Sequence, residues 1–448
     1  MEAAASIITP AVRRTSSRAV PGPPRPRSGG FSELPSHFGL GACVLHLFFL
    51  LAGRSGPVGL PAIDLLVAGL GAAWILVRVP RPSPEAFPPP PPPADRSDRR
   101  WLLPAAILLA ALCATTLCLP LYDWEARIHW ALKAKMLAAD PTLAAGAFRD
   151  PYRLHIHPRY PLLVPFLASL VARHQGEFLE AHYQILIAVF SLLAAWQLRA
   201  LLLRLARPPV ANALAAVAAF SGAWLSALFG SQVEVALAFF LVLALDRMIR
   251  WFEGRRAVDL AFAGVFLFGC AMTKNEGLLL GVAALLSFFA AALGEEGPRG
   301  AGRATALLGG VFLLLSSAWF ACLPGIPPVS DEHYLSRLSL AVLARGVDRL
   351  PAIGGAILSR VADLPRWHLL WLIPPFAVVR LFRKPFRADP MLRLPLLLAG
   401  AYLAGLLAIY MVSPWHDIGL QVRVSFDRAA LPLLPLFAAI AARALGDG

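Results

Sequence analysis

The chain has 448 residues, of which 58% are hydrophobic and only 15% are charged. Soluble domains average about 45–50% apolar and about 25% charged residues, so this composition excludes an ordinary soluble domain. It predicts an all-α, polytopic membrane protein, because several apolar runs approach the ~20 residues that cross a bilayer. The net charge of +14 does not indicate nucleic-acid binding, since Arg and Lys collect in short loops between apolar runs.

The first hundred residues divide into three parts. Residues 1–37 are basic and rich in Pro and Ser, which predicts a disordered cytoplasmic arm. Two apolar segments predict two transmembrane helices within residues 38–79. Residues 80–100 contain an unbroken proline run and predict an extended cytoplasmic linker. Residues 101–443 would then form the main domain, separate from this N-terminal part.

The main domain is expected to hold about ten spans, which makes about twelve in the whole bundle. The first is the apolar run 101–121, and a polar loop with interfacial helices follows at 122–160. A short apolar piece ends near residue 172. The remaining spans are predicted near 181–203, 210–228, 235–251, 257–272, 277–293, 304–323, 367–382, 394–412 and 429–443.

Loop charge orients these spans. Fourteen Arg and Lys residues lie in the four loops assigned inside, at 199–209, 246–256, 294–303 and 380–393. Only four lie in the short loops assigned outside, at 53–57, 229–234, 273–276 and 413–428. By the positive-inside rule, both termini are expected in the cytoplasm, with residues 122–160 and 324–366 on the outer face of the inner membrane.

The stretch after the first main-domain span predicts a helix that lies on the membrane surface. Trp124, Ile128, Leu132 and Met136 recur every fourth residue and would share one apolar face. Lys133 falls off this face and reads as a solvated residue or a contact to anionic lipid heads.

The unusual polar residues all fall on the predicted outer side. Ionisable groups at membrane depth are costly and usually mark a site. Carboxylates together with Lys and Arg at one end of a helical bundle suit a lipid whose phosphate lies at the interface. These residues are Asp123, the stretch His155 to Pro161, Glu234, Lys274, Glu276, His416, Asp417, Asp427 and Arg428.

The order of these residues resembles the GT-C superfamily of integral membrane glycosyltransferases. The similarity is greatest to the branch of Rgt-like domains, dolichyl-phosphate-mannose–protein mannosyltransferases and lipid A glycosyltransferases. It covers roughly residues 101–443, and Glu234 stands where an aspartate is usual. The matching elements are Asp123, Tyr160-Pro161-Leu162-Leu163, Gly230 to Val235, Met272 to Gly277, and Ser425 to Arg428 with Pro432 and Pro435.

This resemblance implies transfer of a sugar from a polyprenyl-phosphate-linked donor to a cell-envelope acceptor, with inversion at the anomeric carbon. The acceptor would be a lipid, a polysaccharide or a protein. Asp123 is the leading candidate for the catalytic base, with Glu234 as the second carboxylate. Lys274 and Arg428 are the candidates for binding the donor phosphate. The candidates for substrate contact are Trp124, His157, Tyr160 and Glu276.

Several alternatives stay open at the level of sequence. Asp123 is equally suited to cap the surface helix, and the two roles can coexist. No cofactor is firmly implied, but a divalent ion bound by Asp123, Glu234 and a histidine is a further interpretation. The alternative function is a multispan transporter or lipid flippase. The absence of a repeat between the halves, and the gathering of charges at one face, favour the enzyme.

Overall fold

The computed structural model describes residues 33–54, 57–67, 96–143, 146–150, 155–329, 337–382 and 389–445. Every regular element within these ranges is a helix, which confirms the predicted all-α class. Most of the predicted basic arm (1–37) and of the proline-rich linker (80–100) lies outside the described residues, as does the end of the second N-terminal span.

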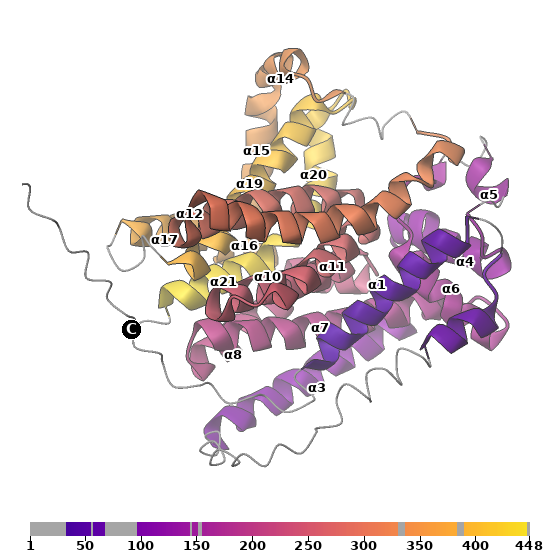
Figure 1. The fold of residues 1–448 in the computed structure, drawn as a ribbon, viewed down its shortest axis with the longest axis horizontal. Helices are drawn as coiled ribbons and strands as arrows, with labels where there is room; N and C mark the ends of the chain where they lie inside the picture. The colour runs from indigo at the N-terminus through magenta and orange to yellow at the C-terminus, as the bar shows by residue number, and fades with distance from the viewer. Residues whose placement is uncertain are drawn as a thin grey trace, which may run out of the picture.

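The helices are arranged as a bundle with a smaller group that projects from it (Figure 1). The N-terminal half contains α1 (Leu34–Ala52), α3 (Arg96–Cys118), the π-helix η2 (Ala126–Ala131), α4 (Leu132–Ala139), α5 (Gly146–Arg149), α6 (Leu163–Gln175), α7 (Glu180–Leu205), α8 (Pro208–Ala219) and α9 (Gly222–Phe229). The C-terminal half contains α10 (Glu234–Gly254), α11 (Ala257–Thr273), α12 (Asn275–Phe320), α14 (Leu340–Gly346), α15 (Leu350–Val361), α16 (Leu364–Trp367), α17 (Ile373–Leu381), α19 (Pro390–Val412), α20 (Ile418–Ala429) and α21 (Leu433–Leu445).

Helix α10 lies at the centre of the bundle. It is apolar on all sides from Val235 to Leu245, and it is buried along this length between α7 and α11. A helix that is hydrophobic all round belongs in the interior of a large protein or a membrane. Beyond these neighbours of α10, α11 packs on α12, and α12 packs on α19.

Helix α1 is part of this bundle and not a separate N-terminal unit. It packs against α6, α7, α10, α11 and α12. The ring of Phe49 stacks on Phe166 of α6 with centroids 4.3 Å apart, and Gly39 lies so close to Leu243 of α10 that a Cβ would be 2.5 Å from it. The predicted boundary near residue 100 therefore does not separate two packing units, and α3 itself already begins at Arg96.

The predicted number of about twelve spans is not confirmed. Among the described residues, four helices are long and apolar enough to cross a membrane, or six if two bent pairs each count as one span. The pairs α8–α9 and α20–α21 bend by 49° and 57°. The predicted spans 277–293 and 304–323 are two arms of α12 that turn back on each other at Gly297, where φ is +67°. Gly281 of one arm lies against Phe312 of the other, and Gly309 lies against Leu285. Several other predicted spans are helices too short to count by length among the described residues.

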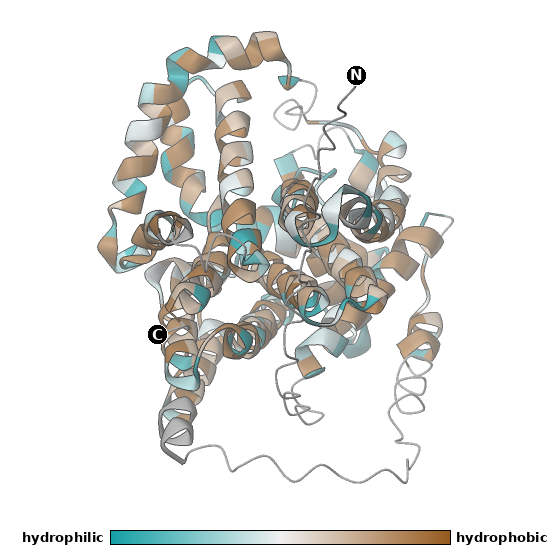
Figure 2. Ribbon diagram, turned by 60° about the vertical axis from the view of Figure 1, so that its left-hand side comes forward, coloured by the Kyte–Doolittle hydropathy of each residue, from teal (hydrophilic) through white to brown (hydrophobic). Residues whose placement is uncertain are grey.

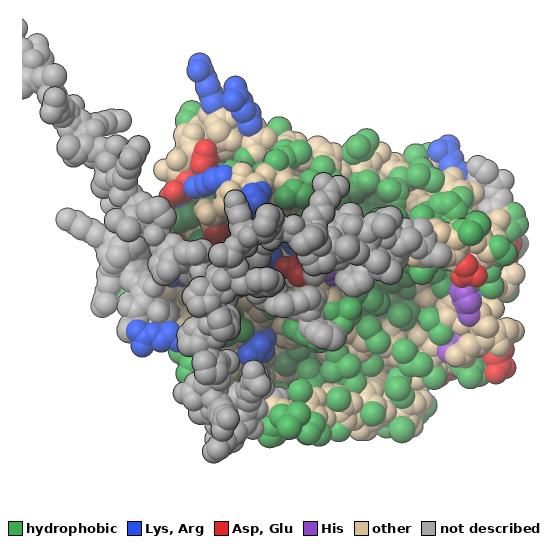
Figure 3. All heavy atoms as spheres, turned by 60° about the horizontal axis from the view of Figure 1, so that its bottom comes forward, with side chains coloured by type: hydrophobic (Ala, Val, Ile, Leu, Met, Phe, Trp, Pro, Cys, Tyr) green, Lys and Arg blue, Asp and Glu red, His purple; other side chains and the backbone are tan. Residues whose placement is uncertain are grey.

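The outer surface of the bundle is largely hydrophobic. Hydrophobic residues colour most of the length of the helices in Figure 2. Hydrophobic side chains cover much of the part of the face in Figure 3 that is not drawn in grey. Such a surface suits contact with lipid tails, and the helical fold satisfies the backbone hydrogen bonds internally, as a membrane requires.

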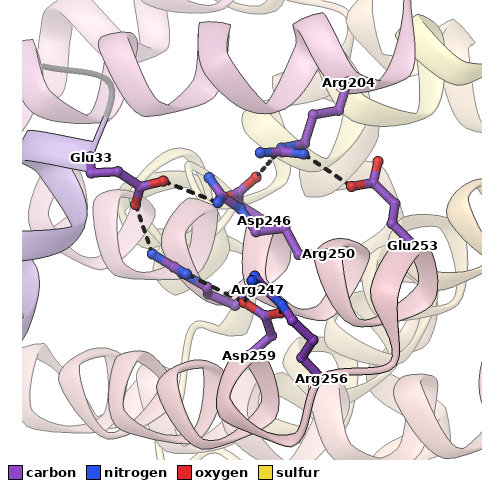
Figure 4. A network of polar contacts seen from close by, with 8 residues as sticks. All are labelled: Glu33, Arg204, Asp246, Arg247, Arg250, Glu253, Arg256 and Asp259. Carbon is purple, nitrogen blue, oxygen red and sulfur yellow. Dashed lines mark hydrogen bonds and ion pairs between the residues drawn. The ribbon is translucent and has the colours of Figure 1, made fainter. Parts of the chain in front are cut away.

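A network of ion pairs closes one end of the bundle (Figure 4). Asp246 of α10 is 1% exposed and pairs with Arg204 at 3.0 Å and with Arg250 at 2.8 Å. Glu33, just before α1, pairs with Arg250 at 3.1 Å and with Arg247 at 3.0 Å. Four of the arginines in loops assigned inside, Arg204, Arg247, Arg250 and Arg256, thus serve to join α1, α7, α10 and α11.

Two predicted outer loops are in part helical. Residues 413–428 were expected as a loop, but α20 occupies most of them, because the side chain of Asp417 caps it by accepting from the Leu420 N–H at 2.8 Å. Residues 324–366 include α14, α15 and α16. Helices α14, α15 and α20 form the group that projects from the bundle in Figure 1, and α15 packs along α20.

Candidate functional site

Lys274 is placed at the sharp junction between α11 and α12. Its backbone is extended, so α11 ends at Thr273 and α12 starts again at Asn275. The two helices meet so closely that a Cβ on Gly277 would lie 1.8 Å from the carbonyl oxygen of Cys270. Only glycine fits at this point, and the close crossing fixes where the lysine side chain enters the bundle.

Three carboxylates surround the Lys274 ammonium group. Its Nζ lies 2.6 Å from Glu234 Oε1, 3.2 Å from Glu125 Oε1 and 3.4 Å from Glu276 Oε1. Glu234 opens α10, and its side chain is only 2% exposed. The structure thus brings together three of the predicted site residues, Glu234, Lys274 and Glu276, from the ends of different helices.

Glu125 connects this group to Arg428. Its second carboxylate oxygen, Oε2, accepts from Nη1 of Arg428, near the end of α20. Arg428 therefore joins the cluster through Glu125. We call Glu125, Glu234, Lys274, Glu276 and Arg428 the ionic cluster. Glu125 is not among the residues predicted from the sequence, because a glutamate two residues after Asp123 has the position of the solvated face of a surface helix.

Asp123 caps the surface helix, as one of the alternatives proposed. Its Oδ1 accepts from the Ala126 N–H at 3.0 Å, and its Oδ2 accepts from the Gln232 side-chain amide at 3.3 Å. Both of these partners are neutral, and the side chain is half-buried. Gln232 precedes Glu234 by two residues, so Asp123 lies at the edge of the ionic cluster.

The surface helix buries two polar residues together with apolar ones. Trp124 of the predicted apolar stripe is 61% exposed, whereas His129 and Lys133 are buried. Lys133 donates to the His157 carbonyl oxygen at 2.7 Å, so its expected role as a solvated residue is wrong. The reason is that this helix packs on α6. Of the predicted apolar stripe only Trp124 is exposed, whereas Ile128, Leu132 and Met136 are half-buried.

An aromatic group surrounds His129 beside the cluster. The His129 ring lies 4.5 Å from the His157 ring and 4.8 Å from the Trp124 ring. Tyr160 stacks near His157, with centroids 4.8 Å apart. The candidates for substrate contact, Trp124, His157 and Tyr160, are thus neighbours around one imidazole whose two ring nitrogens have no hydrogen-bond partner among the described residues.

The charges of the site have clear electrostatic consequences. Burial by itself raises the pKa of Glu125, but the charges of Lys274 and Arg428 outweigh this effect and lower the pKa to about 2. Burial lowers the pKa of His129 to about 3, against the opposing attraction of Glu125. At neutral pH Glu125 is therefore ionised and His129 is neutral.

The described residues do not bring together a metal site. No group of three His, Cys, Asp or Glu side chains in the described ranges is placed to hold a metal ion. The interpretation of a divalent ion bound by Asp123, Glu234 and a histidine therefore has no support from the geometry, because Glu234 is directed to Lys274.

A separate groove of about 670 Å³ lies between α15 and the start of α20. His416, Asp417 and Arg423 line it together with small residues of α15. Helix α20 thus borders the groove near its N-terminus and carries Arg428 of the ionic cluster near its C-terminus.

The ionic cluster and the network of Figure 4 lie at opposite ends of α10. Glu234 and Asp246 are twelve residues apart in this helix, which corresponds to about 18 Å. Glu234, Lys274, Glu276 and Arg428, which the sequence assigned to one common side, therefore meet at one end of α10. Asp427 does not join them, because it pairs with Arg360 and Arg366.

Comparison with solved structures shows one whose fold matches, the crystal structure of ArnT from Cupriavidus metallidurans bound to undecaprenyl phosphate. The TM-score is 0.52 at 17% sequence identity. The fold of this chain is therefore similar to that of ArnT. This confirms the resemblance read from the sequence at the level of the fold. The match covers 77% of this chain and 60% of the ArnT chain, and no protein-family model and no curated protein matches the sequence.

Proposed function

We propose that this protein is a membrane glycosyltransferase that takes a sugar from a polyprenyl-phosphate-linked donor. The observation that carries the proposal is the ionic cluster at one end of the bundle. The fold is similar to that of ArnT, whose crystal structure holds undecaprenyl phosphate. The acceptor would be a component of the cell envelope, and the reaction would invert the anomeric carbon. The loop charges support an outer-face site in the inner membrane, with both termini in the cytoplasm.

Lys274 and Arg428 are the groups that we assign to the donor phosphate. Transfer of the sugar leaves negative charge on the phosphate, and fixed cations at that point stabilise the transition state. Glu234 is buried against Lys274 at 2.6 Å. We therefore assign it to holding the lysine in place, which changes its expected role as a second carboxylate that meets the acceptor.

Asp123 remains the proposed base. It is half-buried, and its recorded partners are the Ala126 N–H and the Gln232 amide, so its carboxylate keeps lone pairs that can accept the proton of an acceptor hydroxyl. Trp124, His157 and Tyr160 lie on the same surface and would contact the substrate around the reacting group.

The variant Asp123→Asn tests this assignment. Asparagine caps a helix about as well as aspartate, so the fold and the thermal stability should be retained. Transfer should fall by at least about 100-fold, since a general base contributes about 10²–10⁴-fold. The measurement is transfer from a polyprenyl-phosphate sugar to candidate envelope acceptors by the purified full chain in nanodiscs.

Asp140→Asn is the matched control, because Asp140 ends the same surface helix and is exposed. It should retain transfer. Full activity of Asp123→Asn would remove Asp123 as the base, while a wild-type protein that transfers no sugar from any such donor would argue against the proposed function itself.

A further inference from the structure

Glu125 lies between the two cations that we assign to the donor phosphate. One of its carboxylate oxygens pairs with Lys274 at 3.2 Å, and the other pairs with Arg428. A phosphate bound by both cations would have to accept hydrogen bonds from the same two groups, the Lys274 ammonium and the Arg428 guanidinium, that now donate to Glu125. Glu234 and Glu276 also pair with Lys274, but the ion pairs of the described residues join neither of them to Arg428.

The charge balance of the cluster opposes a further anion. Three carboxylates, Glu125, Glu234 and Glu276, face two cations, Lys274 and Arg428. The excess is one negative charge. A sugar-linked polyprenyl phosphate is itself an anion, so its binding beside all three carboxylates would be repulsive in this poorly solvated place. One carboxylate must give up its cations for the phosphate to take them.

Exposure and pairing together indicate which carboxylate this is. The Glu234 and Lys274 side chains form the floor of the cluster, at 2% and 7% exposed. Glu125 is 15% exposed and Glu276 is 23% exposed, so both lie nearer the surface than Glu234. Of these two, only Glu125 also pairs with Arg428, so only Glu125 holds both cations that the phosphate would need.

A π turn lies directly beside this carboxylate. Glu125 has α-helical backbone angles and directly precedes the π-helix η2, in which the hydrogen bonds skip one residue more than in an α-helix. Single π turns are often found at functional sites. The position of Glu125 next to such a turn fits a residue that takes part in ligand exchange.

We infer that Glu125 competes with the donor phosphate for Lys274 and Arg428, so that carboxylate and phosphate are alternative partners of the same two cations. This inference rests on the proposed function, because it takes the two cations as the phosphate site. It makes Glu125 a positioning residue that limits the affinity for phosphate-linked lipids and keeps the cations aligned for them. The same competition would help the product phosphate to leave.

The experiment compares binding of undecaprenyl phosphate with binding of undecaprenol, which has the same chain and no phosphate. Both are titrated into the purified full chain in nanodiscs. Glu125→Gln should bind undecaprenyl phosphate about tenfold more tightly than the wild type, as expected when one charge-assisted hydrogen-bond competitor is removed. Its affinity for undecaprenol should not change.

Glu276→Gln is the matched control. It removes one negative charge from the same lysine, at 3.4 Å, without touching the pair with Arg428. If both variants gain the same affinity for undecaprenyl phosphate, the gain comes from the loss of one negative charge in general. The inference that Glu125 competes with the phosphate would then be wrong. Unchanged or weaker phosphate binding by a folded Glu125→Gln would overturn it as well.

Glu125→Asp is the second variant, for use if Glu125→Gln does not fold. Its side chain is one methylene shorter and keeps the charge but cannot span both cations. It should also bind undecaprenyl phosphate more tightly, and tighter binding of undecaprenyl phosphate but not of undecaprenol supports the competition. If the wild type binds undecaprenol and undecaprenyl phosphate equally, the failure lies with the proposed function, because the site then does not recognise phosphate.

Discussion

At the scale of single residues, the site depends on charges that the fold removes from water. His129 is 5% exposed and has no hydrogen-bond partner for its ring among the described residues. Burying an unsatisfied polar group costs about 1–3 kcal/mol. The His129 ring lowers the stability of the fold and lies beside the proposed reaction centre. This is expected if the ring is kept as a polar group that contacts the substrate.

The pH dependence of stability should reveal this histidine. Its pKa lies near 3 in the folded protein, because burial lowers it from 6.5. Between these values the unfolded chain binds a proton that the folded chain does not, so the free energy of unfolding falls as the pH falls through this window. The slope is at most about 1.4 kcal/mol per pH unit. Glu125 affects stability in a lower pH range. Its contribution to the free energy of unfolding is lost as the pH falls from about 4.5 toward about 2.

Thermal unfolding of the protein in detergent at pH 7, 6 and 5 measures this slope. His129→Phe should raise the melting temperature, most strongly at pH 5, and should flatten the decline with acid. His155→Phe is the control, because His155 is exposed, and it should keep the slope of the wild type. An equal slope in His129→Phe and the wild type would assign the acid sensitivity to other groups.

At the scale of elements, the site depends on where helices end and cross. Lys274 is directed to the cluster because α11 stops at Thr273 and α12 begins at Asn275 after one extended residue. Gly277 permits this close crossing, since any Cβ would meet the Cys270 carbonyl. Glu125 lies at the start of the surface helix, directly before the π-helix η2.

Gly277→Ala should therefore destabilise the protein by about 3 kcal/mol, because a methyl group has no room and the two helices must separate. It should also weaken binding of undecaprenyl phosphate, since Lys274 moves with the junction. The measurements are the melting temperature and the titration in nanodiscs. Gly310→Ala in the same helix has no atom within 4 Å of the new Cβ, and it should be neutral or stabilising by up to about 1 kcal/mol. Equal stability of the two variants would contradict the close crossing.

At the scale of the whole molecule, two charged clusters close the two ends of the central helix. The ionic cluster is left with one negative charge in excess, which suits exchange with a ligand. The network of Figure 4 pairs four carboxylates with four arginines and is balanced. We interpret it as the structural end, which ties α1 to the bundle through Glu33.

Asp246→Ala tests this division. It leaves Arg204 and Arg250 without their buried partner, and such a loss costs about 3–5 kcal/mol. The folded fraction should still bind undecaprenyl phosphate with the affinity of the wild type, because the site lies at the other end of α10. Glu253→Ala removes a partner that is 26% exposed and should cost no more than about 1 kcal/mol. A loss of binding in folded Asp246→Ala would show that the two ends are coupled.

Much of the molecule could be predicted from the sequence, because apolar runs and loop charges are local signals. They indicated a helical membrane protein, and they placed Asp123, Glu234, Lys274 and Arg428 on a common side, where the structure brings them to one end of the bundle. The number of spans was harder to predict, since the mean hydropathy of a stretch of sequence does not distinguish a straight span from a bent pair such as α8–α9.

Only the tertiary structure decided which charges meet. Glu125 and Arg428 are 303 residues apart, and no local pattern marks such a pair. Lys133 and His129 have the spacing of a solvated face, but packing on α6 buries them. By itself the sequence determined the helices and their polarity, because these depend on neighbours along the chain. The site depends on how helices cross and end, and therefore only the packed bundle shows which carboxylate lies between the two cations.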